Sequence, residues 1–99
     1  IKPNIEAKKV DETARNYIDS KGYGKYFSHG TGHGVGLAIH EYPYITSLES
    51  GILKENMVFT VEPGIYIPNL GGVRIEDTIV VTNDGFKVLT NYPKEVEII

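Results

Sequence analysis

The chain opens with a helical pattern of apolar and polar positions. Between residues 5 and 21, apolar side chains recur at helical spacing, namely Ile5, Val10, Ala14, Tyr17 and Ile18. Polar and charged side chains fill the rest, namely Glu6, Lys8, Lys9, Asp11, Glu12, Arg15 and Asn16. Pro3 and Asn4 suit the start of a helix, and Gly22 suits a C-terminal cap. We therefore predict an amphipathic helix whose charged residues form a solvated face.

Short β-type runs follow a glycine-rich stretch at residues 22–44, which excludes a regular helix. Residues 57–67 are rich in β-formers and are interrupted at Pro63-Gly64, and residues 69–72 indicate a turn. A second strand is predicted at 73–82, and Asn83-Asp84-Gly85 then indicates a hairpin into a strand at 86–90. The predicted fold class is α+β, an N-terminal helix followed by an antiparallel meander.

Composition limits the classes of partner. The chain has 99 residues, a net charge of −3 and a pI near 5.5, which argues against nucleic acid or an anionic membrane surface as its partner. It contains no cysteine, so a disulfide framework and thiolate metal ligands are excluded, and the composition is compatible with the cytosol. No apolar run approaches the ~18 residues of a membrane span. We expect a cytoplasmic protein without a membrane or nucleic-acid partner.

All three histidines, His29, His33 and His40, fall within a stretch of glycines and small residues. The spacing of the first two matches a helical zinc-protease signature, but the glycines between them disfavour a helix and the expected glutamate is absent. The glycines also fail the spacing of a dinucleotide-binding loop. On an extended strand, His29 and His33 share a face, and His40 lies on the other face unless a turn or bulge intervenes.

Two glutamates lie in apolar, strand-like surroundings, Glu62 before Pro63 and Glu76 in the second predicted strand. Alternation places Glu76 on the same face as Arg74. One interpretation is a cross-strand salt bridge on a solvated face. The other is a pair of carboxylates that, with an imidazole, binds Mn²⁺, Co²⁺, Fe²⁺ or Zn²⁺, with Arg74 holding a carboxylate or the substrate.

Four motifs in a fixed order resemble the pita-bread metallopeptidases. They are Phe27-Ser-His-Gly-Thr-Gly-His-Gly-Val-Gly-Leu, Ile39-His-Glu, Thr60-Val-Glu-Pro-Gly-Ile-Tyr and Gly72-Val-Arg-Ile-Glu-Asp. Within that family the sequence is most similar to the proline-specific branch, the Xaa-Pro aminopeptidases and Xaa-Pro dipeptidases (prolidases). The resemblance extends from the first helix to Leu89-Thr90.

The resemblance implies a role for each candidate residue. His33, Glu62 and Glu76 match metal ligands, and His29 and His40 match two histidines that bind the substrate and stabilise the reacting carbonyl. Arg74 matches an arginine beside the site in the proline-specific members. The implied cofactors are two divalent ions, Mn or Co before Zn or Fe. The implied reaction is attack of a metal-bridging hydroxide on the peptide bond that precedes proline, in a proline-containing peptide.

The family also uses two aspartate ligands upstream of the helix, and no aspartate of this chain matches them. The resemblance therefore implies that residues 1–99 are the C-terminal half of a catalytic domain. We expect the isolated chain to be inactive, to bind at most a single ion weakly and to self-associate, and the complete enzyme to be a homodimer. The alternatives are a methionine aminopeptidase-like or creatinase-like hydrolase and a non-catalytic pita-bread binding module.

Overall fold

A computed structural model of the chain describes residues 1–96 and begins with one long helix. Helix α1 spans Ala7–Ser20 and is followed by a short 3₁₀ helix η1, Gly24–Tyr26. The end of α1 is a Schellman motif, since Gly22 adopts a φ of +85° and the N–H groups of Gly22 and Tyr23 donate to the carbonyls of Asp19 and Ile18. The predicted helix and its glycine cap are confirmed.

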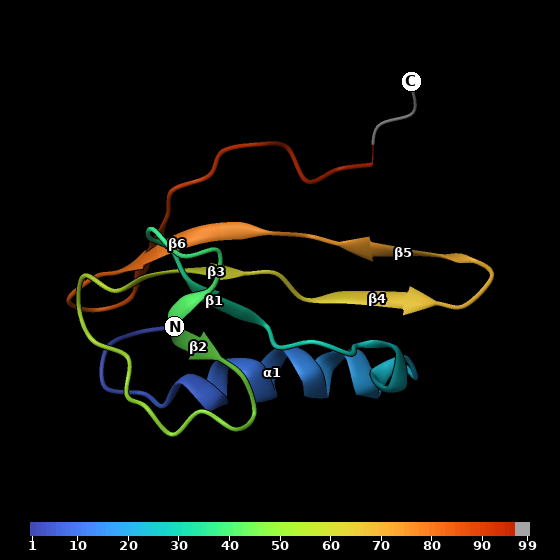
Figure 1. Ribbon diagram of the computed structural model, residues 1–99, viewed down its shortest axis with the longest axis horizontal. Helices are drawn as coiled ribbons and strands as arrows, with labels where there is room; N and C mark the ends of the chain where they lie inside the picture. Colours follow the sequence, from blue (N-terminus) through green and yellow to red (C-terminus); the bar gives the residue numbers. More distant parts are fainter. Residues whose placement is uncertain (97–99) are drawn as a thin grey trace.

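All strands pair in antiparallel fashion. The main sheet has the order β2-β1-β3-β6-β7, built from β1 (Gly32–Gly34), β2 (Glu41–Ile45), β3 (Val58–Val61), β6 (Asp77–Val81) and β7 (Phe86–Val88). A separate hairpin joins β4 (Gly64–Ile67) to β5 (Gly71–Arg74). Figure 1 shows α1 lying along one side of the strands, with the β4–β5 hairpin projecting beyond the main sheet. The α+β class is confirmed, and β1 and β2 add strands inside the glycine-rich segment.

Each of the two long predicted strands is divided in the middle. The interruption predicted at Pro63-Gly64 is present one residue earlier, at Glu62-Pro63, because proline has no N–H for the ladder, while Gly64 already belongs to β4. The break between β5 and β6 falls at Ile75-Glu76, so the continuous strand predicted at 73–82 is wrong. The register is nevertheless the same on both sides: Val61 pairs with Asp77 and Gly64 with Arg74. This register sets Glu62 opposite Glu76.

The core lies between α1 and the main sheet. It is formed by the buried side chains Ala7, Val10, Ile45, Leu53, Phe59, Ile79 and Val81. Asp11, on the same helix, is also fully buried, and it forms an ion pair with Arg15. The prediction of a wholly solvated charged face is therefore wrong at these two positions. The reason is tertiary: the glycine-rich segment crosses this part of the helix and brings polar partners to it.

The segment after β7 returns along the other side of the hairpin (Figure 1). It is held at Asp77, which accepts hydrogen bonds from Thr90 at 2.6 Å and from Lys94 at 2.9 Å. These two bonds, the Thr90 hydroxyl first, lower the pKa of Asp77. Among residues 1–96, no helix combines the length and the apolar character that a membrane span needs.

Candidate active site

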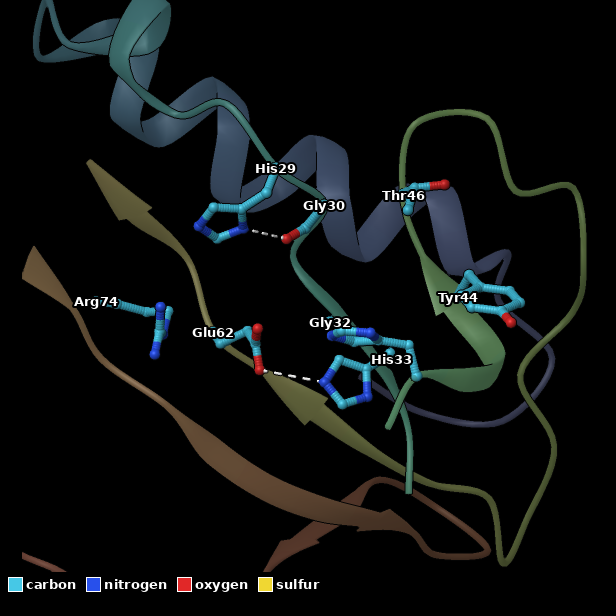
Figure 2. A pocket seen from close by; sticks show the side chains of 9 residues that line it. His29, Gly30, Gly32, His33, Tyr44, Thr46, Glu62 and Arg74 are labelled. Atoms are coloured by element: carbon cyan, nitrogen blue, oxygen red, sulfur yellow. Dashed lines mark hydrogen bonds and ion pairs between the residues drawn. The ribbon is translucent and has the colours of Figure 1, made fainter. Parts of the chain in front are cut away.

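Five of the six candidate residues line one open cavity of about 310 Å³, namely His29, His33, His40, Glu62 and Arg74. Figure 2 shows Arg74 and His33 on opposite sides of Glu62, with His29 above Arg74 and Glu62 in this view. Glu76 does not line this cavity. It lines an adjoining hollow of about 350 Å³ that shares Arg74 with the first. The sequence-predicted residues thus fall around one region of the fold, on both sides of the strand breaks.

His33 comes from β1 and faces Glu62 across the gap that follows β3. Its Nε2 lies 3.6 Å from Oε2 of Glu62, and both side chains are more than four-fifths buried. The Nδ1 atom of His33 lies 2.8 Å from the carbonyl oxygen of Gly34, and a carbonyl oxygen only accepts, so Nδ1 carries the proton. In the neutral imidazole this leaves the Nε2 lone pair directed to the side on which Glu62 lies.

Glycines permit this arrangement by allowing close contact between backbones. A methyl group at Gly32 would collide with the carbonyl group of Thr60 on β3, and one at Gly34 would collide with the carbonyl of Tyr42 on β2. The Thr60 hydroxyl accepts a hydrogen bond from the His33 N–H at 3.1 Å. Strand β1 is therefore pressed between its two neighbours, which fixes the backbone of His33.

His40 reaches the same cavity by an irregular route. The pairing of β1 with β2 shifts register between His33 and Gly34, and the rings of His33 and His40 then meet edge to face with centroids 4.5 Å apart. His40 itself is exposed. The sequence predicted that His40 would lie on the other face from His33 unless a turn or bulge intervened. The fold contains such an irregularity, and His40 lies beside His33.

His29 is the end of a chain of hydrogen bonds that the sequence did not predict. Its Nδ1 lies 2.7 Å from the Gly30 carbonyl oxygen and therefore donates to it. Its Nε2 lies 2.8 Å from the Tyr66 hydroxyl, and the same hydroxyl interacts with Arg74, whose pKa it raises. Tyr66 thus connects His29 with Arg74. Its parity on the hairpin, two residues beyond Gly64 and four beyond Glu62, is the sequence signal that points to it.

Neighbouring groups raise the pKa values of both Glu76 and Arg74. Partial burial, then the hydrogen bond to Glu62 and its charge, raise the pKa of Glu76, while Arg74 and His33 act against this shift. The hydrogen bond with Tyr66, followed by the nearby carboxylates, raises the pKa of Arg74. Nε of Arg74 lies 3.8 Å from Oε2 of Glu76, with both side chains about half exposed. The Arg74–Glu76 contact predicted from strand parity is present.

The donor set suits a divalent cation but is incomplete. His33 Nε2 and the Glu62 carboxylate are two electron-pair donors facing one another, and the other ring nitrogen of His33 is held by a carbonyl, as in metal-binding histidines. Carboxylates and imidazole suit first-row divalent ions. Within residues 1–96, no three histidine, aspartate or glutamate side chains converge closely enough to form a metal site by themselves.

Comparison with known proteins decides the family. The sequence model of metallopeptidase family M24 matches residues 1–83, from α1 through β6. The chain belongs to metallopeptidase family M24. A matching M24 relative, an uncharacterized peptidase of Staphylococcus aureus strain MW2, is 56% identical over 94 residues, which cover 95% of this chain and 27% of that protein. This chain therefore spans about a quarter of the length of the curated relatives that it matches.

Solved structures confirm the fold as a fragment of the pita-bread fold. An Xaa-Pro dipeptidase from Bacillus anthracis is 52% identical, with a TM-score of 0.97 over 100% of this chain and 28% of that one. An X-Pro aminopeptidase from Thermotoga maritima is 43% identical, with a TM-score of 0.95 over 99% of this chain and 28% of that one. The resemblance inferred from the four motifs is confirmed, including its proline-specific branch.

Proposed function

We propose that this chain supplies the histidine–glutamate half of the catalytic site of a proline-specific metallo-exopeptidase, and that residues 1–99 are the C-terminal half of its catalytic domain. The observation that carries the proposal is the facing of His33 Nε2 and Glu62 Oε2 at 3.6 Å, with Nδ1 of His33 held by the Gly34 carbonyl. Similarity to a dipeptidase and to an aminopeptidase supports the Xaa-Pro specificity and leaves the length of the substrate open.

His33, Glu62 and Glu76 would hold divalent ions, Mn²⁺ or Co²⁺ first, together with two aspartates from outside this chain. When bound, such ions activate water and polarise the scissile carbonyl group. A cation would also offset the burial of Glu76 and its interaction with Glu62, which together raise the pKa of Glu76. The complete enzyme would be a cytoplasmic homodimer acting on proline-containing peptides.

The remaining residues supply binding and proton transfer. The His29 ring, with the Nδ1 proton donated to the Gly30 carbonyl, accepts from the Tyr66 hydroxyl, and the guanidinium of Arg74 interacts with that hydroxyl. A substrate carbonyl oxygen or carboxylate entering the cavity would therefore meet Arg74 as a cation, while Tyr66, whose single hydroxyl proton goes to His29, would hold the His29 ring in place. His40, exposed beside His33, is placed to donate to developing negative charge on the substrate.

The test uses the complete protein encoded by the gene, loaded with Mn²⁺ or Co²⁺. We expect hydrolysis of Ala-Pro, much slower hydrolysis of Ala-Ala and of Met-Ala, and no turnover by the isolated 99-residue chain. Glu62→Gln should abolish activity, while Glu55→Gln, at an exposed position outside the cavity, should leave it unchanged. Preference for Met-Ala would instead indicate a methionine aminopeptidase-like enzyme, and no hydrolysis of any of the three peptides would indicate a binding module.

A further inference from the structure

A buried ion pair of helix α1 holds the segment that leads into the site. Asp11 is fully buried, and its two carboxylate oxygens accept from Nε and Nη2 of Arg15 at 3.0 and 3.1 Å. The same guanidinium donates from Nη1 to the carbonyl of Phe27 at 2.9 Å and from Nη2 to the carbonyl of His29 at 2.8 Å. The central carbon of this guanidinium, Cζ, also lies 4.1 Å from the centre of the Phe27 ring. Arg15 thus binds the backbone on either side of Ser28.

Thr31 connects this ion pair to the other side of the cavity. Both its N–H and its hydroxyl donate to Oδ1 of Asp11, at 3.1 and 2.9 Å, and the residue is fully buried. Its carbonyl accepts the Glu62 N–H at 2.6 Å, just where β3 ends. The backbone of Glu62 is therefore attached through one residue to the buried carboxylate of Asp11.

We infer that Asp11, Arg15 and Thr31 form a positioning unit that sets where His29 and Glu62 stand in the cavity. None of the three lines the cavity, so any effect on the reaction passes through other residues. A buried carboxylate without these partners would be strongly unfavourable, so the four hydrogen bonds that Asp11 accepts from Arg15 and Thr31 hold both of these residues in place. The planar fork of Arg15 matches two carbonyls and a carboxylate at once, which a lysine cannot do.

The consequence is a fixed relation between two side chains on different elements. His29 lies in the loop before β1 and Glu62 lies after β3, and the positioning unit attaches both backbones to the same turn of α1 (Figure 2 shows α1 behind this part of the site). Catalytic groups that shift by about 1 Å can lose a hundredfold in rate. This inference rests on the proposed function for its kinetic readout.

The test removes the Thr31 hydroxyl without changing the size of the side chain. In the complete Mn²⁺-loaded protein we expect Thr31→Val to lower kcat on Ala-Pro by about tenfold or more with a smaller change in KM. Thr31→Ser, which keeps the hydroxyl, should restore kcat to within about threefold. Thr13→Val is the matched control, because the Thr13 hydroxyl is exposed and donates within α1 to Lys9. Arg15→Lys should lower kcat on Ala-Pro in the same way as Thr31→Val. If a thermal melt shows that Thr31→Val does not fold, Arg15→Lys replaces it in the test.

A second measurement separates this inference from the proposed function. The side-chain ¹⁵N signals of His29, observed by NMR in histidine-labelled protein, should shift in Thr31→Val and stay in place in Thr31→Ser and Thr13→Val. If the unsubstituted protein does not hydrolyse Ala-Pro, the proposed function fails, and the His29 signals alone test whether Asp11, Arg15 and Thr31 position His29. Unshifted His29 signals in both Thr31→Val and Arg15→Lys, or equal loss of kcat in Thr31→Ser and Thr31→Val, would overturn the inference.

Discussion

Glu62 stands opposite Glu76 in a single hairpin register, at the point where both strands of the hairpin are interrupted. The interruption has a chemical cause on one side, where Pro63 has no N–H and the Glu62 N–H turns away to the Thr31 carbonyl. Two carboxylates thereby lie at a gap in the sheet, that of Glu62 largely buried and that of Glu76 about half exposed. Their mutual effect gives the first prediction.

Stability without metal should depend on pH through Glu76. Burial and Glu62 raise the pKa of Glu76 above its ordinary value of 4.5, so the folded state binds this proton more tightly than the unfolded state. Such a contribution is full below the unfolded pKa and is lost as the pH rises through the folded pKa. In chelator, we expect Glu76→Gln to lose less thermal stability than the unsubstituted protein as pH rises from acid to neutral. Parallel Tm curves for the two proteins would contradict this.

Removing the Tyr66 hydroxyl should slow the reaction and loosen His29. Tyr66→Phe deletes the hydrogen bond to His29 and the interaction of the hydroxyl with Arg74, and a single such loss in a partly buried site is worth about 1–3 kcal/mol, or roughly fivefold or more in kcat. Steady-state kinetics on Ala-Pro checks this. Tyr17→Phe, on the exposed surface of α1, is the control. Equal rates for the two variants would show that the hydroxyl is not used.

A methyl group at Gly32 should destabilise the fold. It would collide with the Thr60 carbonyl, which belongs to the backbone and cannot rotate away, so we expect Gly32→Ala to lower the free energy of unfolding by about 2–3 kcal/mol. Gly85→Ala is the matched control, since a methyl group there meets only the Thr82 hydroxyl at 3.9 Å. Urea denaturation compares the two. A destabilisation of Gly32→Ala no larger than that of Gly85→Ala would contradict the close contact between β1 and β3.

The isolated chain should self-associate. Large apolar side chains are exposed on its surface, among them Leu37, Ile39 and Leu48 at 108%, 85% and 93% of full exposure. Extensive exposed apolar surface and free strand edges promote association. Size-exclusion chromatography should show dimers or larger species. A monomer with a cooperative melt would argue against the view that these surfaces are covered by another half of the catalytic domain.

Local patterns in the sequence were sufficient for much of the fold. Helical spacing gave α1, Gly22 gave its end, and alternation with turn residues gave the β3–β4 break and the β6–β7 hairpin. The break at Ile75-Glu76 carries no proline or glycine, because its cause is Pro63 on the partner strand, which accepts from the Ile75 N–H at 3.3 Å but has no N–H to donate in return. Such a cause lies across the sheet and leaves no mark in the local sequence.

In the site, too, local motifs predicted some residues, and others depend on contacts between distant parts of the chain. Motifs identified His29, His33, His40, Glu62, Arg74 and Glu76, and the fold brings five of them around one cavity. Asp11 was assigned to a solvated face because a helical pattern shows only which residues share a face, not which segment later covers them. Tyr66 was missed because its role depends on a contact with His29, which lies far from it along the chain.

The uninterrupted register across the two breaks has a consequence for changes in chain length. Residues added or removed in pairs at the β4–β5 turn lengthen or shorten the tip of the hairpin and leave Glu62 facing Glu76. One residue added between Val61 and Gly64 would shift every pair on one side of the break and turn the following side chains, Tyr66 included, to the opposite face. Variation in length should therefore be found at the tip of this hairpin and be absent from its middle.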